Sequence, residues 1–268
     1  MSQTELPNVS ILMPTYDRRN FLPLIMTNLY SIDYPKDKLE VVIIDDHKSP
    51  LFINDTEVKM VMERVGININ YIRDTSRHLS IGEKRNRLVK FAKHKICINM
   101  DDDDIYFPSY IRYSVDLLQS NKYGLVGSAQ MLFLYPHHNW KIAGIQCESK
   151  RQIHEATMCF TKKYWRSMGG FAKNGNGEGS KMVDFNDNKC GYSECGNCMM
   201  CVCHSNNTVD KEMFADKNVG GDGSISDEIK IVVAACLEID YEPEPERHPV
   251  FEDSSSDSKI DDDEYIHI

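Results

Sequence analysis

The most constraining feature of this sequence is a set of short, continuous apolar runs that each end in polar residues. Residues 9–13 form the first run and stop at Pro14, while residues 40–44 form the second and lead into Asp45 and Asp46. Unbroken apolar runs of this length are typical of strands buried on both faces, as in a parallel sheet covered by helices. We therefore expect two buried strands, the first stopped by its proline and the second carrying two carboxylates at its exit.

Helical patterns alternate with these runs. Apolar residues recur at helical spacing between Phe21 and Leu29, and residues 82–93 place Leu88 and Ala92 on one face. A further helix is expected after Ser109, which is a good capping residue. Further strands are expected at residues 69–72, 95–100, 125–127 and 131–134. This alternation predicts an α/β fold with a Rossmann-like, mostly parallel sheet flanked by helices.

The net charge of −10 is concentrated at the C-terminal end of the chain. Residues 237–268 hold twelve Asp or Glu against two Lys or Arg, so the preceding part is neutral. This composition predicts an acidic disordered tail, which either solubilises the protein or binds a partner. Nucleic acid is disfavoured as a partner because no basic face is evident.

Composition also indicates the cellular compartment of the protein. No run of about 18 apolar residues is present, and the N-terminus lacks the basic and apolar regions of a signal peptide. The nine cysteines are an odd number, and several are scattered singly, which argues against a disulfide scaffold. We therefore expect no transmembrane segment and a cytoplasmic, reducing location.

Four consecutive aspartates, Asp101–Asp104, directly follow the strand expected at residues 95–100. Such a run is often a solvated loop, but the carboxyl end of a strand in an α/β sheet is where ligands and metals bind. Hard oxygen ligands suit Mg²⁺ or Mn²⁺, which keep free positions for phosphate oxygens. The run therefore predicts a site for a metal-bound diphosphate.

Several of these segments together resemble the family 2 glycosyltransferases. The matching pieces, in the order and spacing of that family, are residues 9–18, 41–46, 84–86 (Lys-Arg-Asn), 101–108 and 169–171 (Gly-Gly-Phe). The resemblance implies a GT-A fold with one glycosyltransferase domain over residues 1–236. Its nucleotide-binding half would span about 8–135, and a smaller acceptor half about 136–236.

The resemblance also implies a nucleotide site. The turn after the first strand, with Thr15, Tyr16 and Asp17, would hold the base together with Asp46, and Asp45 is the second choice. A carboxylate accepts from a base N–H, and an aromatic ring offers a stacking face. Asp46 is alternatively a plain turn residue.

Around the phosphates, Arg85 occupies the place of a family arginine near the nucleotide, although it also fits a solvated helix face. Among the aspartates, the alignment puts Asp103 on the metal and Asp101 or Asp102 near the ribose. Asp101 is a plausible second metal contact, and Asp104 lies outside the first ligand sphere.

In the acceptor half, the family follows its Gly-Gly-Phe landmark with an acidic pair, one member of which deprotonates the acceptor. This chain has Glu178 followed by Gly179, so we expect Glu178 to be the catalytic base and Asp184 to be a substitute. The glycine-rich surroundings are alternatively just a mobile turn.

The cysteine-rich segment that follows permits two interpretations. Its spacing suggests a structural Zn²⁺ site at Cys190, Cys195 and Cys198, whereas residues 199–203 look like a buried strand with small apolar thiols. His204 resembles the late histidine by which many GT-A enzymes complete a Mn²⁺ site, and is otherwise a surface residue.

Taken together, the sequence predicts a metal-dependent, inverting glycosyltransferase of the hexosyltransferase class (EC 2.4). It would move a sugar from a nucleotide-diphospho-sugar, preferably a UDP-sugar, to a glycan, protein or small-molecule acceptor, with Mn²⁺ or Mg²⁺ as cofactor. One rival is a nucleotidyltransferase, which would favour a glycine-rich phosphate loop after the first strand. Another is a non-catalytic GT-A-like binding or scaffold protein, which the altered pair at Glu178 keeps open.

Overall fold

The computed structural model describes residues 5–147, 152–175, 177–183, 189–207, 209–217 and 225–243. Within these residues the chain forms a seven-stranded sheet in the order β10-β6-β9-β4-β1-β2-β3. The strands are β1 (Val9–Thr15), β2 (Leu39–Asp45), β3 (Asn68–Arg73), β4 (Ile96–Asn99), β6 (Leu125–Gly127), β9 (Cys159–Thr161) and β10 (Cys190–Tyr192). Only β9 runs antiparallel to its neighbours among these described strands, so the expected mostly parallel α/β sheet is confirmed.

The central strand β1 continues through its proline, so the expectation that Pro14 stops the strand is wrong. β1 pairs with β2 as far as Thr15, whereas its pairing with β4 ends at Leu12. Leu12 accepts from the Met100 N–H on the β4 side, and Pro14 shares the parity of Leu12. The missing N–H of Pro14 therefore faces the side on which pairing has already ended, and it removes no hydrogen bond from the sheet.

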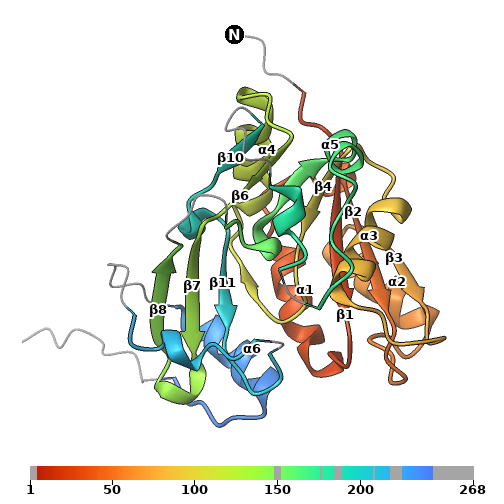
Figure 1. Ribbon diagram of the computed structural model, residues 1–268. Coiled ribbons are helices and arrows are strands. Elements are labelled where there is room, and N and C mark those ends of the chain that lie inside the picture. Colours follow the sequence, from red (N-terminus) through yellow and green to blue (C-terminus); the bar gives the residue numbers. More distant parts are fainter. Residues whose placement is uncertain are drawn as a thin grey trace, which may run out of the picture.

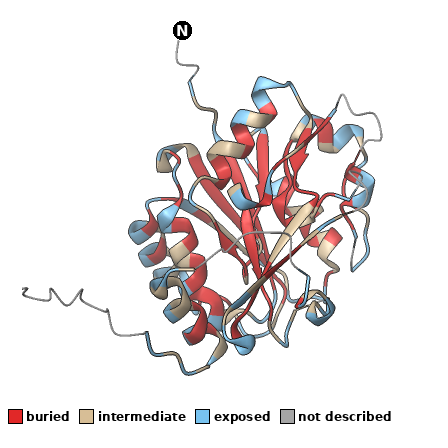
Figure 2. Cartoon of the chain, turned by 90° about the vertical axis from the view of Figure 1, so that its left-hand side faces the viewer, coloured by how far each residue is buried: buried red, intermediate tan, exposed pale blue. Residues whose placement is uncertain are grey.

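Helices cover both faces of the large sheet (Figure 1). Apolar residues of α1 (Leu22–Ser31), α2 (Asp55–Val65) and α4 (Tyr110–Ser120) form one core with alternate residues of the strands. Residues of α3 (Ile81–Phe91) and α5 (Lys162–Ser167) form the core on the opposite face. Burial on both faces explains why the strands read as continuous apolar runs, and Figure 2 shows them buried along their lengths.

A four-stranded sheet in the order β5-β11-β7-β8 lies beside the large one. Its strands are β5 (Ile105–Tyr106), β7 (Gln130–Tyr135), β8 (Lys141–Gln146) and β11 (Met199–Val202). The helix α6 (Asp227–Leu237) covers this sheet and packs its Val233 and Cys236 with Leu24 of α1. This second sheet takes β8 and β11 from the predicted acceptor half but β5 and β7 from the predicted nucleotide-binding half, so the division near residue 135 stays a prediction.

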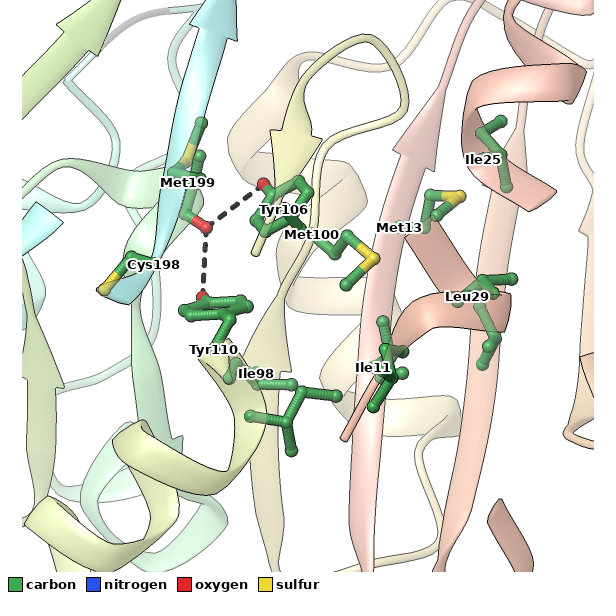
Figure 3. Close-up of a cluster of buried hydrophobic side chains, with 14 of the residues drawn as sticks. Ile11, Met13, Ile25, Leu29, Ile98, Met100, Tyr106, Tyr110, Cys198 and Met199 are labelled. Atoms are coloured by element: carbon green, nitrogen blue, oxygen red, sulfur yellow. Dashed lines mark hydrogen bonds between the residues drawn. The ribbon is translucent and has the colours of Figure 1, made fainter. Parts of the chain in front are cut away.

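Two buried tyrosines join the two sheets (Figure 3). Tyr106 of β5 donates its hydroxyl to the Ala156 carbonyl at 3.3 Å, and the Tyr110 hydroxyl lies 3.2 Å from the same carbonyl and 2.9 Å from the Asn99 carbonyl of β4. The Tyr106 hydroxyl also accepts from the Asp101 N–H at 2.7 Å. Asp101, the first aspartate of the acidic run, is therefore fixed in place where the two sheets meet.

The folded part extends beyond residue 236, where we placed the start of the tail. Leu237 belongs to α6, and the ring of Tyr241 packs on Trp140 at 5.0 Å between centroids. Residues 244–268 lie outside the described residues, so the disordered tail stays a prediction. None of the helices in the described ranges is long and apolar enough to cross a bilayer.

Candidate active site

A cavity of about 360 Å³ opens at the carboxyl ends of β1 and β4. Its wall includes Tyr16 and Arg18 from the turn after β1, Lys84 from α3, Asn206 from beyond β11, and Asp101–Asp103 from the exit of β4. Strand exits of a parallel sheet meet at one edge, and this is where α/β proteins bind their ligands.

The four aspartates point in different directions. Asp101 pairs with Arg85 at 3.0 Å, whereas Asp102 and Asp103 face Arg18 at 3.7 and 3.1 Å. Asp104 turns inward, and its Oδ1 accepts from the Val202 N–H of β11 at 3.0 Å. Asp104 therefore ties the two sheets together, while the other three carboxylates are presented at the cavity.

Asp103 meets His204, which lies 101 positions later in the sequence. The Nε2 atom of His204, just after β11, is 3.2 Å from Oδ2 of Asp103. Burial opposes ionisation of Asp103, but the hydrogen bond with His204 and the charge of Arg18 lower the pKa of its carboxyl to about 2. Burial and the neighbouring Asp103 have the opposite effect on Asp102 and raise its pKa well above the usual range.

These residues match a hard divalent cation in type, because carboxylate oxygens and an imidazole are the ligands that Mn²⁺ and Mg²⁺ accept. Arg18 supplies the positive charge in this conformation, and its Nη2 also donates to the Asn206 carbonyl at 2.8 Å. Among the described residues, no three His, Cys, Asp or Glu side chains converge closely enough to hold a metal without rearrangement. Arg18 was not expected at the site, although it directly follows the turn formed by Thr15, Tyr16 and Asp17.

Where β1, β2 and β3 end, Tyr16, His47 and His78 form an aromatic cluster, and Tyr16 and His78 line the same cavity. The ring of Tyr16, which is 41% exposed, lies 4.7 Å from the His47 ring and 4.6 Å from the His78 ring. Lys84 Nζ lies 5.1 Å from the same ring centroid. Asp17 adopts a left-handed φ of 55° and pairs with His47 at 3.1 Å. This cluster offers an exposed ring and a nearby cation, which suit a nucleobase.

The two aspartates after β2 hold the surrounding backbone rather than facing the cavity. Asp45 accepts from the Leu51 N–H at 2.9 Å and from the Tyr71 hydroxyl at 2.6 Å. Asp46 accepts from the Leu79 N–H and pairs with Lys84, both at 2.5 Å. Lys84 in turn donates to the Thr15 carbonyl at 2.8 Å, so Asp46 fixes the loops that carry the aromatic cluster.

Arg85 is buried and pairs with two carboxylates. Its Nε donates to Glu178 at 2.7 Å, and its Nη2 lies 3.0 Å from Asp101. Glu178 is itself buried, and Gly82 in the first turn of α3 packs so closely that a Cβ there would lie 1.7 Å from the Ala172 carbonyl oxygen. The segment that carries Glu178 is thus packed firmly against α3. Asp184 lies outside the described residues.

Comparison with known proteins decides the family. The model of glycosyl transferase family 2 matches residues 10–177, which is more than half of the chain. The chain belongs to this family. Like other family 2 proteins it has a GT-A fold, and solved structures share the architecture.

Two solved structures illustrate this likeness. A mannosyltransferase, PcManGT from Pyrobaculum calidifontis in complex with GDP-Man and Mn²⁺, is 21% identical with a TM-score of 0.56, covering 79% of this chain and 59% of that chain. S. aureus TarS 1–349 in complex with UDP-GlcNAc is 14% identical with a TM-score of 0.53, covering 75% of this chain and 60% of that chain. This family 2 chain therefore spans about three fifths of the length of the structures that it matches.

The cysteines of this family 2 chain do not support the expected zinc site. Cys190 packs in one hydrophobic core and Cys198 in another, and every cysteine is a free thiol. Burial raises the pKa of the Cys195 thiol, and raises that of Cys198 to about 12. Cys190 and Cys198 lie in separate cores, and no three metal-ligating side chains converge within the described part of the chain, so these buried cysteines pack as small apolar residues.

Proposed function

We propose that this family 2 protein is a metal-dependent, inverting glycosyltransferase that moves a sugar from a nucleotide-diphospho-sugar to an acceptor hydroxyl. The observation that carries this proposal is the single cavity that Asp103 and the Tyr16 ring both line, with His204 3.2 Å from Asp103. A cation site and a base site on one cavity match a donor that has a diphosphate next to a nucleoside. The solved structures with GDP-Man and Mn²⁺ and with UDP-GlcNAc support this class of donor.

Asp103 and His204 would hold the divalent cation, with Asp101 as a further ligand. When bound, the metal would neutralise charge on the departing diphosphate. Arg18, which pairs with Asp103 at 3.1 Å, would then be free to contact phosphate oxygens as the cation takes over its partner. Asp102, whose pKa is raised by burial, would face the ribose as a hydrogen-bonding group.

The aromatic cluster would bind the base by stacking on Tyr16. The base site would also depend on the loops that are held by Thr15, Asp17, Asp45 and Asp46. We prefer UDP-sugars as donors. Arg85 would fix Asp101 at the β4 exit, since the two pair at 3.0 Å. A transferase of the hexosyl class is expected, with Mn²⁺ or Mg²⁺ equally suited to the oxygen ligands.

Replacing Tyr16 with alanine should weaken binding of the nucleoside diphosphate about 5- to 150-fold, because stacking on an aromatic ring is worth about 1–3 kcal/mol per base. Binding of inorganic pyrophosphate should hardly change, since it has no base. Calorimetric titration of both ligands measures the difference. The matched control is Tyr30→Ala, which removes a tyrosine that is 71% exposed on α1 and does not line the cavity. Equal losses for both ligands would contradict the role of Tyr16.

A screen of UDP- and GDP-sugars with and without Mn²⁺ tests the function itself. A ligand at 100 times its dissociation constant stabilises a protein by about 2.7 kcal/mol, so a true donor should raise the melting temperature measurably in Mn²⁺ and lose the effect in EDTA. Release of the nucleoside diphosphate from the same donor would establish turnover. A protein that binds a nucleotide but never releases it from a sugar donor would be the non-catalytic binding protein instead.

A further inference from the structure

Inverting sugar transfer needs a group that accepts the proton of the acceptor hydroxyl. Glu178, the carboxylate that the sequence favoured for this task, is buried, and its Oε1 accepts a hydrogen bond from Arg85 Nε at 2.7 Å. The Arg85 guanidinium already occupies that oxygen, so an incoming hydroxyl could reach it only by displacing the arginine. Glu178 is thus well placed to hold Arg85 and poorly placed to collect a proton.

A second carboxylate, Glu155, reaches the same cluster from a different part of the chain. It begins the short 3-10 helix Glu155–Thr157 beside the end of β4, where its carbonyl accepts from the Asn99 side chain at 2.7 Å. Its Oε1 accepts from the Gly179 N–H at 3.1 Å. The side chain is partly buried rather than enclosed.

Glu155 fills the space that a side chain at Gly179 would need. A Cβ on Gly179 would lie 2.5 Å from Cγ of Glu155 and 3.0 Å from its Oε1, with Met158 Cε at 2.6 Å. The backbone of Gly179 has φ −78° and ψ −16°, which any L-residue adopts, so the glycine is required by space and not by conformation. The carboxylate of Glu155 therefore stands where an acid following Glu178 would stand.

We infer that Glu155 is the catalytic base of this protein and that Glu178 is a positioning residue that acts through Arg85. This inference rests on the proposed glycosyltransferase function. The acceptor oxygen forms the new bond to the anomeric carbon, its proton passes to Glu155, and the old bond breaks with its electron pair leaving on the nucleoside diphosphate. Burial and the nearby Glu178 raise the pKa of Glu155, while the charge of Arg85 opposes them, and a raised pKa strengthens a base.

The decisive experiment compares Glu155→Gln with Glu178→Gln and with the control Glu194→Gln, an exposed acid on another loop. Transfer rate, donor affinity and melting temperature are measured for each, using the donor found in the screen. Glu155→Gln should lower the transfer rate about 10²- to 10⁴-fold with donor affinity and melting temperature nearly unchanged, because glutamine keeps the shape but accepts no proton. Glu178→Gln should lower the melting temperature, because it weakens the hold on Arg85.

Two substitutions that move a carboxylate from position 155 to position 179 test the placement of the Glu155 side chain through stability, independently of turnover. Gly179→Asp alone should lower the melting temperature, since its Cβ collides with Glu155, whereas Glu155→Ala combined with Gly179→Asp should be more stable than the sum of the two single changes predicts. The combined variant should also recover part of the transfer rate lost in Glu155→Ala, since it returns a carboxylate to the same place.

If Glu155→Gln transferred sugar at the native rate, or if the stability changes of Glu155→Ala and Gly179→Asp simply added in the combined variant, the inference would be wrong. The proposed function would still stand. A slow Glu178→Gln with unchanged stability would return the base to Glu178. A native protein that binds and turns over no nucleotide-sugar would instead refute the proposed function, and the assignment of Glu155 with it.

Discussion

Asp103→Asn should abolish Mn²⁺-dependent donor binding, with a loss of more than about 100-fold in affinity when the metal is present. Loss of a partner that merely orients a metal ligand already costs 10- to 100-fold, and this substitution removes the charge of the ligand itself. Asparagine keeps the size of the side chain, so the protein should stay folded. Titration of the donor with and without Mn²⁺, followed by circular dichroism of the variant, measures both effects.

The control for this prediction is Asp33→Asn. Asp33 pairs with Arg112 at 3.3 Å on the surface and does not line the cavity, so donor binding should keep its full metal dependence. Donor binding that is indifferent both to EDTA and to Asp103→Asn would show that Asp103 has no part in a metal site.

Arg85→Met should destabilise the protein by about 3–5 kcal/mol, the usual cost of removing one partner of a buried ion pair. Glu178 would be left buried without its cation and the partly exposed Asp101 would lose its partner, since Arg85 now lies 2.7 and 3.0 Å from them. Burial already raises the pKa of Asp101, and removing Arg85 raises it further. The loss in the free energy of unfolding caused by Arg85→Met should therefore grow as the pH rises and the carboxylates ionise. Urea unfolding at several pH values measures it.

Arg77→Met provides the matched comparison. Arg77 pairs with Glu83 at 2.6 Å, but its side chain is 52% exposed, and exposed pairs contribute little because water screens both charges. If Arg85→Met and Arg77→Met shifted the urea midpoint equally, the buried cluster would have no special part in stability.

The parts of the fold that depend on local pattern could be predicted from the sequence. Continuous apolar runs predicted β1 and β2 because both strands are buried on both faces, and Ile69 and Ile72 marked the more exposed β3. The helix α2 was missed, although Asn54 caps it by accepting from the Glu57 N–H at 3.0 Å, because its mostly exposed surface weakens the apolar pattern. Pro14 was misjudged because its effect depends on where a neighbouring strand ends, which local sequence does not reveal.

The candidate site was likewise predictable from the sequence only in part. The exits of the strands were recognisable, and the contact of Asp103 with His204 follows from the expected roles of both. Which of four identical aspartates turns inward depends on the Val202 N–H, 98 positions from Asp104, and no local pattern contains that information. Glu155 was missed for a similar reason, because it reaches Gly179 only through tertiary packing.

The distance in sequence between Asp103 and His204 has a consequence for synthesis of the protein. During translation, β1 to β4 and the helices α1 and α3 can assemble once the first hundred or so residues leave the ribosome, because those strands pair with one another. The nascent chain then displays its aspartates without the histidine or the Asn206 carbonyl that holds Arg18. A growing chain therefore cannot complete the proposed metal site until residues beyond β11 have emerged and the second sheet can form.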